Sequence, residues 1–183
     1  MLPEAELFVM AELMLVEVLG RIREPDLQVE LPPMHPGSPR PVTMARAVQD
    51  HLREDRLVPE LLGGPPPPPD ADVAQVAEAA CAAARQVAED GSSAQGLTAR
   101  EFLLRSTLTR AFLAHYVAAY LGSTACPLPE ELARPLSELT GPQAARWREL
   151  GWFRAPMPLP EHVSWRDRFL LDAGHEPHPL GHP

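Results

Sequence analysis

Prolines divide this chain into segments and limit what each segment can form. The chain has 183 residues, 23 of them proline, and many of the prolines lie in the stretches 25–41, 65–69 and 156–160. Proline lacks a backbone N–H and fixes φ, so it interrupts helices and is excluded from central strands. The apolar runs between these stretches repeat every three or four residues. We therefore predict an all-α protein whose helices are joined by extended connections.

The N-terminal half predicts two long helices. The first covers about residues 4–22, where apolar side chains recur with helical spacing. Residues 23–42 contain six prolines and are expected to be an extended connection. Thr43 is a suitable N-cap for the second helix, which should end near Leu57, before Pro59.

Two further long helices follow the proline tract 65–69, which we expect to form a stiff surface loop. Asp70 or Asp72 should cap the third helix, an Ala-rich segment that ends at Gly91. Thr98 and Glu101 form a capping box at the start of the fourth helix, which Gly122 closes.

The C-terminal part predicts shorter elements. Helices are expected from Pro127 and from Pro142, and a Pro-rich strap over 152–160 is expected to pack over a groove. Ser164 should cap a last short helix. Residues 1–174 are expected to form a single domain, and residues 175–183, with three histidines, a flexible tail.

Composition excludes several classes of function. The net charge of -9 comes without a clustered basic stripe, which argues against nucleic-acid binding. The apolar runs are broken by Glu or Arg before they could span a bilayer, and the N-terminus is acidic where a secretory signal would be basic. We therefore expect a cytoplasmic protein without a membrane partner. Cys81 and Cys126 lack metal-ligand spacing and are expected to be small buried residues.

Two histidines on separate helices are the strongest functional signal. His115 lies in the apolar fourth helix and His51 in the second, and facing helices of a bundle can direct such side chains at one interior point. A catalytic zinc site needs a third protein ligand, but Ala111 occupies the position one turn before His115. Glu54 or Asp55 could share the face of His51, although their charged surroundings favour a solvated helix end.

The order of these segments resembles the DinB-like superfamily, in the branch of the mycothiol-dependent maleylpyruvate isomerases. The resemblance lies in the opening helix, in segment 43–52 with His51, in the helix of His115, and in the Pro-x-Pro-x-Pro ending followed by Asp-Arg-Phe-Leu-Leu over 156–171. It implies a four-helix bundle with additional short C-terminal helices and a metal bound by His51, His115 and a carboxylate. Ala111 stands in the carboxylate's place, and Ala118 stands where relatives commonly have Asp.

Three functional hypotheses follow. The first is a small-molecule enzyme, an isomerase, cyclase or dehydratase, that uses His51 and His115 as acid–base groups without a tightly bound metal. In it, Arg110, Tyr116 and Tyr120 would donate to an anionic or carbonyl oxygen, although a surface salt bridge for Arg110 and core packing for the tyrosines are the ordinary alternatives.

The second hypothesis is a mycothiol-dependent S-transferase or isomerase with a Zn, Ni or Fe type metal on the same histidines. The third is a non-catalytic small-molecule binding protein. A homodimer is compatible with each.

Overall fold

The computed structural model describes residues 2–34, 40–87, 97–122 and 127–179. The chain is mainly α-helical, as predicted, with one small antiparallel sheet. Among the described residues, no helix has both the length and the apolar character that crossing a bilayer requires.

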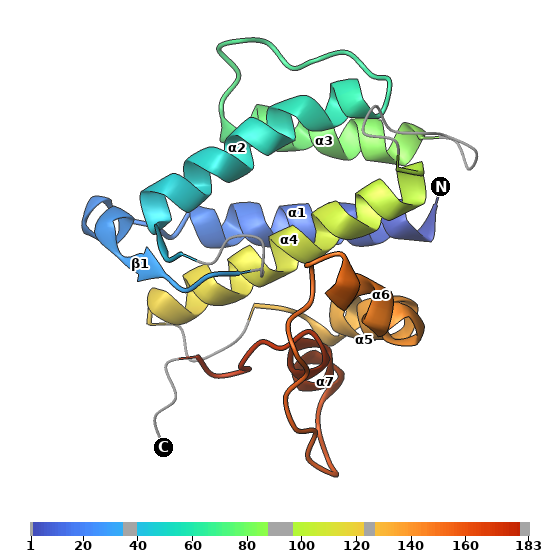
Figure 1. Cartoon of the computed structure of the whole chain (residues 1–183). Helices are drawn as coiled ribbons and strands as arrows, with labels where there is room; N and C mark the ends of the chain where they lie inside the picture. Colours follow the sequence, from blue (N-terminus) through green and yellow to red (C-terminus); the bar gives the residue numbers. More distant parts are fainter. Residues whose placement is uncertain (1, 35–39, 88–96, 123–126, 180–183) are drawn as a thin grey trace.

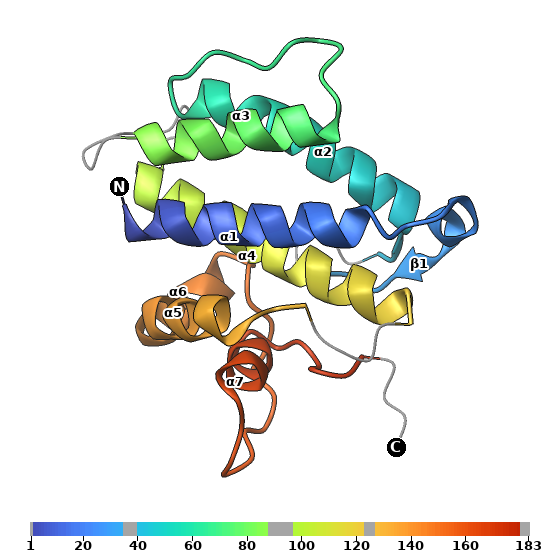
Figure 2. The same ribbon diagram turned by 180° about the vertical axis from the view of Figure 1, so that it is seen from behind.

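Helices α1 (Pro3–Leu19) and α4 (Ala99–Tyr120) lie against each other at the centre of the molecule. Helix α3 (Val73–Gln86) packs against α1 and also against α2 (Met44–Leu61). Figures 1 and 2 show α2 and α3 on one side of this central pair and the short C-terminal helices on the other. Helix α4 therefore has protein on both sides, and most of its residues are buried.

The connection before α2 contains more structure than predicted. A 3-10 helix, η1 (Glu24–Gln28), is followed by strand β1 (Glu30–Leu31), which pairs with β2 (Val42–Thr43). Pro25 fits at the start of η1, where its missing N–H breaks no helical hydrogen bond, and Asp26 accepts a hydrogen bond of 2.8 Å from the Arg23 amide. The extended assignment is thus wrong for this short turn.

The predicted N-caps are confirmed, whereas the predicted end of the second helix is wrong. Thr43 Oγ1 accepts from the Arg46 amide at 3.3 Å, and Asp72, not Asp70, caps α3. Helix α2 continues through Pro59 to Leu61, because Val58 and Pro59 are buried. Tertiary packing here outweighs the hydrogen bond that proline removes.

The remaining loop predictions have mixed outcomes. The capping box at Thr98 is present, and Gly122, with φ of 81°, follows the end of α4. The proline tract is held to α2 by Arg56, which donates to the carbonyl oxygens of Pro68 and Ala71 at 3.0 and 2.7 Å. Helix α3 ends at Gln86 and Val87 is extended, so the predicted end at Gly91 is wrong. Cys126 lies outside the described residues, and Cys81 is buried, as predicted.

The C-terminal helices α5 (Glu130–Thr140), α6 (Ala144–Glu149) and α7 (Trp165–Asp172), together with η2 (Gly141–Gln143), cover the other side of α4. Phe112 of α4 stacks on Phe169 of α7, with ring centroids 5.6 Å apart. Residues 155–160 of the strap do not cover a groove as expected, because they are exposed. Instead the strap follows the end of α7, where the Met157 amide donates to the Leu171 carbonyl at 2.9 Å.

Packed structure continues past Gly174, the expected end of the domain. His175 is fully buried, its amide donates to the Leu170 carbonyl at 2.8 Å, and its ring centroid lies 4.0 Å from that of Phe112. Gly174 makes this turn with φ of 79°, and a Cβ there would lie 2.5 Å from the Ala155 carbonyl oxygen. The segment that was expected to be a flexible tail therefore begins with an anchored residue.

Candidate functional site

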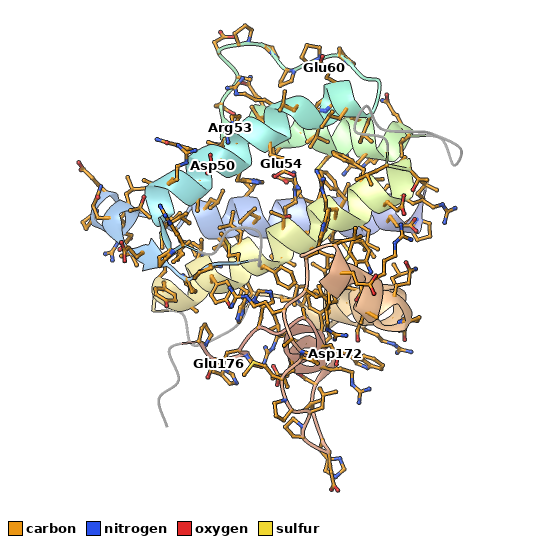
Figure 3. The ribbon with its side chains drawn as sticks, viewed as in Figure 1. Asp50, Arg53, Glu54, Glu60, Asp172 and Glu176 are labelled. Atoms are coloured by element: carbon orange, nitrogen blue, oxygen red, sulfur yellow. The ribbon has the colours of Figure 1, made fainter. Side chains whose placement is uncertain are left out.

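A cleft of about 640 Å³ lies between α2 and α4. Residues 150–152 also line it, and Met34 and Val42 contribute from the connection before α2. Figure 3 shows Asp50, Arg53 and Glu54 along α2, and all three line the cleft. A volume of this size suits a small organic molecule.

The cleft has apolar walls and charged side chains around them. Leu108, Phe112, Leu113 and Trp152 provide the apolar surface. Arg105 lies among them, with its guanidinium carbon 4.9 Å from the centre of the Trp152 ring. These features favour a ligand that has an apolar body and a polar or charged group.

His51 lines the cleft and also belongs to a buried ionic cluster behind it. Its Nε2 lies 3.0 Å from Asp55 Oδ2, one turn further along α2, and 3.6 Å from Glu12 Oε1 on α1. The side chains of the three residues are at most 3% exposed. The cluster thus lies beneath one wall of the cleft.

Arg110 of α4 completes the cluster. Its Nε donates to Glu12 Oε2, its Nη2 to Asp55 Oδ1, and its Nη1 to the Ser106 carbonyl at 2.9 Å. The guanidinium is fully buried and lies over the Phe8 ring, 4.3 Å from its centre. The surface salt bridge considered for Arg110 is therefore wrong, and its engaged donors leave it no direct contact with the cleft.

The charges of the cluster shift its pKa values. Burial alone would lower the pKa of His51, but the carboxylates of Asp55 and Glu12 outweigh the effect of burial and raise this pKa from 6.5 to about 9. Burial raises the pKa of Glu12, yet His51 and Arg110 together lower it to about 2. Burial also raises the pKa of Asp55, against the opposing effect of Arg110. The cluster holds two carboxylates, and the Arg110 guanidinium balances only one of their charges. When no metal cation is bound, His51 therefore carries a proton at neutral pH, and this proton balances the other carboxylate.

Three ligand atoms in this cluster have no hydrogen-bond partner among the described residues: Glu12 Oε1, His51 Nε2 and Asp55 Oδ2. They lie within 4.8 Å of one another. The contacts from Nε2 to the carboxylate oxygens are short, but their direction does not satisfy hydrogen-bond geometry. Buried polar atoms normally have hydrogen-bond partners, so these three atoms, whose described contacts are the ion pairs of His51, could still take a further partner.

His115 does not join His51. It is buried on α4 with its Nε2 2.9 Å from the Glu176 carbonyl oxygen, and it is not among the residues that line the cleft. Burial lowers its pKa. His51 and Arg110 contact the same two carboxylates, so His51 lies on the side of α4 from which Arg110 projects. Residues 110 and 115 point about 140° apart around a helix, so His115 projects from a different side. The predicted convergence of the two imidazoles is therefore corrected to two separate environments.

The two tyrosines are also placed away from the cleft. Tyr116 is buried, and its hydroxyl lies 2.9 Å from His175 Nδ1. Tyr120 is half-buried and packs against the core beside α1 and the β1–β2 pair. Their expected role as donors to a substrate in a shared site gives way to core packing.

Two members of the cluster were missed or misjudged from the sequence. Asp55 was expected at a solvated helix end, but it faces inward, whereas Glu54 lines the open cleft. Glu12 was read only as an interruption of an apolar run. Its signal was present, because it lies four residues after Phe8 and three before Leu15, both fully buried, so it shares their inward face.

The metal site that the family resemblance implies does not fit this chain. His115 contacts the C-terminal segment instead of His51, and Ala111 supplies no ligand. Comparison with protein-family models, curated proteins and solved structures found no match for this chain. The DinB-like assignment therefore stays a prediction.

Proposed function

We propose that this chain is a DinB-like small-molecule enzyme of the isomerase, cyclase or dehydratase type, with its substrate in the cleft and His51 as the acid–base group. The observation that carries this proposal is the position of His51, which lines a cleft of about 640 Å³ while buried carboxylates lie behind it. An imidazole supported by a carboxylate is a common arrangement for proton transfer.

The chemistry would use the ring nitrogen that the cluster does not engage. Nε2 faces Asp55 and Glu12, and no described residue hydrogen-bonds Nδ1. A protonated His51 would donate from Nδ1 to a carbonyl or anionic oxygen of the substrate, while the carboxylates stabilise the imidazolium. The apolar walls would hold the hydrocarbon part of the same molecule.

The geometry changes the roles expected from sequence. His51 keeps its acid–base role, whereas His115, Arg110, Tyr116 and Tyr120 do not line the cleft. Arg110 would act as a positioning residue, since it holds the two carboxylates that contact His51.

The experiment begins with ligand-observed NMR screening of small apolar ketones and carboxylic acids against the purified protein. Leu57→Trp at the cleft should abolish binding of the hits, whereas Leu159→Trp on the strap should leave it unchanged. Both leucines are similarly exposed, at 48% and 45%, so the pair controls for a new surface tryptophan.

Turnover of the bound class then separates enzyme from binding protein. His51→Gln should abolish turnover and retain most of the binding, with folding checked by circular dichroism. Hits whose binding is unaffected by Leu57→Trp would refute the cleft as the site. Binding without any turnover in the wild type would instead identify a non-catalytic binding protein.

A metal-dependent thiol S-transferase is the second candidate, and one observation favours it. The three unpartnered ligand atoms offer a nitrogen and two oxygens, a donor set that suits first-row divalent cations. A bound cation would supply Lewis-acid chemistry toward a thiol such as mycothiol or toward a carbonyl.

A further inference from the structure

We infer that Glu12, His51 and Asp55 form a binding site for one first-row divalent cation, such as Zn²⁺ or Co²⁺. This set replaces the ligands that the family resemblance implies, since it uses neither His115 nor residue 111. The inference rests on the second candidate function, for which it names the metal ligands, and it does not depend on the first, because the cation would lie behind the cleft wall whether or not a substrate is bound.

The spacing of the ligand atoms supports a cation. Zinc binds imidazole nitrogen and carboxylate oxygen at about 2.0–2.2 Å, so neighbouring ligand atoms around it lie about 3.0–3.6 Å apart. Nε2 of His51 is 3.0 Å from Asp55 Oδ2 and 3.6 Å from Glu12 Oε1. All three atoms lie within 4.8 Å of one another and lack hydrogen-bond partners among the described residues.

The secondary structure fixes these ligands. His51 and Asp55 are four residues apart on α2, so both side chains project from one face. Glu12 comes from the buried side of α1, which holds it at 0% exposure. Both helices pack against α3, and a ligand set on such helices is more rigid than one on loops.

Arg110 orients the two carboxylates. It binds the far oxygens, Glu12 Oε2 and Asp55 Oδ1, and so leaves one oxygen of each carboxylate facing His51. Hydrogen bonds of this kind to the outer atoms of ligands fix ligand orientation in metal sites.

Charge also permits a cation at this position. With a neutral His51, two carboxylates against one guanidinium leave a net negative charge in a buried volume. A cation would replace the imidazole proton as the balancing charge. His51 also lines the cleft, which offers a path for the ion and for water as an additional ligand.

The test uses the whole chain, purified without a metal-affinity step, treated with a chelator, and carrying His178→Gln and His182→Gln to remove tail imidazoles. Calorimetric titration with Zn²⁺ at about pH 8, where metal ligands are deprotonated more readily, should show one equivalent bound per chain. Co²⁺ should give the visible absorption bands of a nitrogen and oxygen site.

The variants identify the ligands. Glu12→Gln and Asp55→Asn should each weaken Zn²⁺ binding at least about tenfold. Asp50→Asn and Glu54→Gln are matched controls, since both carboxylates lie on α2 beside the cleft but outside the cluster, and His115→Gln tests the family ligand set. All three should bind as the parent does.

If Glu12→Gln or Asp55→Asn fails to fold, imidazole ¹⁵N spectra of the parent protein replace the variants. Zn²⁺ should shift the His51 signals and leave those of His115 unchanged. The inference is overturned if no equivalent is bound, if the ligand variants bind as tightly as the parent, or if the His115 signals shift instead. If the small-molecule hits still bind in the cleft and Leu57→Trp still abolishes their binding, only the cation site has failed and the cleft remains the proposed substrate site.

Discussion

The proton on His51 predicts a specific dependence of stability on pH in chelator-treated protein. The pKa of His51 is raised from 6.5 to about 9 in the folded chain. A raised pKa means that the folded state binds the proton more tightly than the unfolded state does. The resulting stabilisation is fully present below about pH 6.5 and is lost as the pH rises through about 9.

The magnitude follows from the same two pKa values. At about 1.4 kcal/mol for each pKa unit, the rise from 6.5 to about 9 corresponds to about 3–4 kcal/mol of unfolding free energy. Among the described residues, the other shifted groups contribute little within this pH window. The sequence contains no lysine, the lowered pKa of His115 acts mainly below 6.5, and the thiol of Cys81, whose pKa is raised from 9.0 to about 12, acts mainly above pH 9.

Urea unfolding at a series of pH values with a chelator present measures this effect. The unfolding free energy of the wild type should fall by about 3 kcal/mol between about pH 6.5 and 9. His51→Gln should remove most of this decline, whereas His162→Gln, at an exposed histidine, should keep it. A wild-type stability that is constant or rises over this range would refute the protonated cluster, and so would an unchanged decline in His51→Gln.

Three further predictions concern the fold and are tested by chemical denaturation. Arg110→Met should cost about 3–5 kcal/mol because it leaves one of the two buried carboxylates without a balancing charge, whereas Arg134→Met, at an exposed pair, should cost less than about 1 kcal/mol. Equal effects would refute the buried cluster. Gly174→Ala should cost more than Gly151→Ala, because both have positive φ but only Gly174 lacks space for a Cβ; a reversed order would contradict this turn. Thr98→Ala should cost about 1 kcal/mol through loss of the N-cap, and no loss would contradict the capping box.

The helices were predictable where local interactions define them. The caps at Thr43, Thr98 and Ser164 each involve an amide three residues further on, so the sequence alone contains the required partners. The end of α2 was not predictable in this way. Pro59 normally ends a helix, and only the burial of Val58 and Pro59 against other helices keeps this one intact.

The candidate site was predictable only in part, for the same reason. His51 was selected because facing helices of a bundle can direct two histidines at one interior point, and it does line the cleft, although His115 does not. Asp55 follows one turn later on the same helix, but Glu12 lies on α1 and Arg110 on α4. Local charge patterns cannot show which carboxylate of the pair Glu54 and Asp55 turns inward, since that depends on where α4 places its arginine.

Phe112 limits how the cleft can adapt to a guest molecule. The ring lines the cleft, yet it is also stacked on Phe169 and lies against the ring of His175. A rotamer change that enlarged the cleft at this wall would break both aromatic contacts. Ligand size at this wall is therefore governed by the C-terminal segment, and shortening the chain before His175 should relax selectivity toward bulkier compounds.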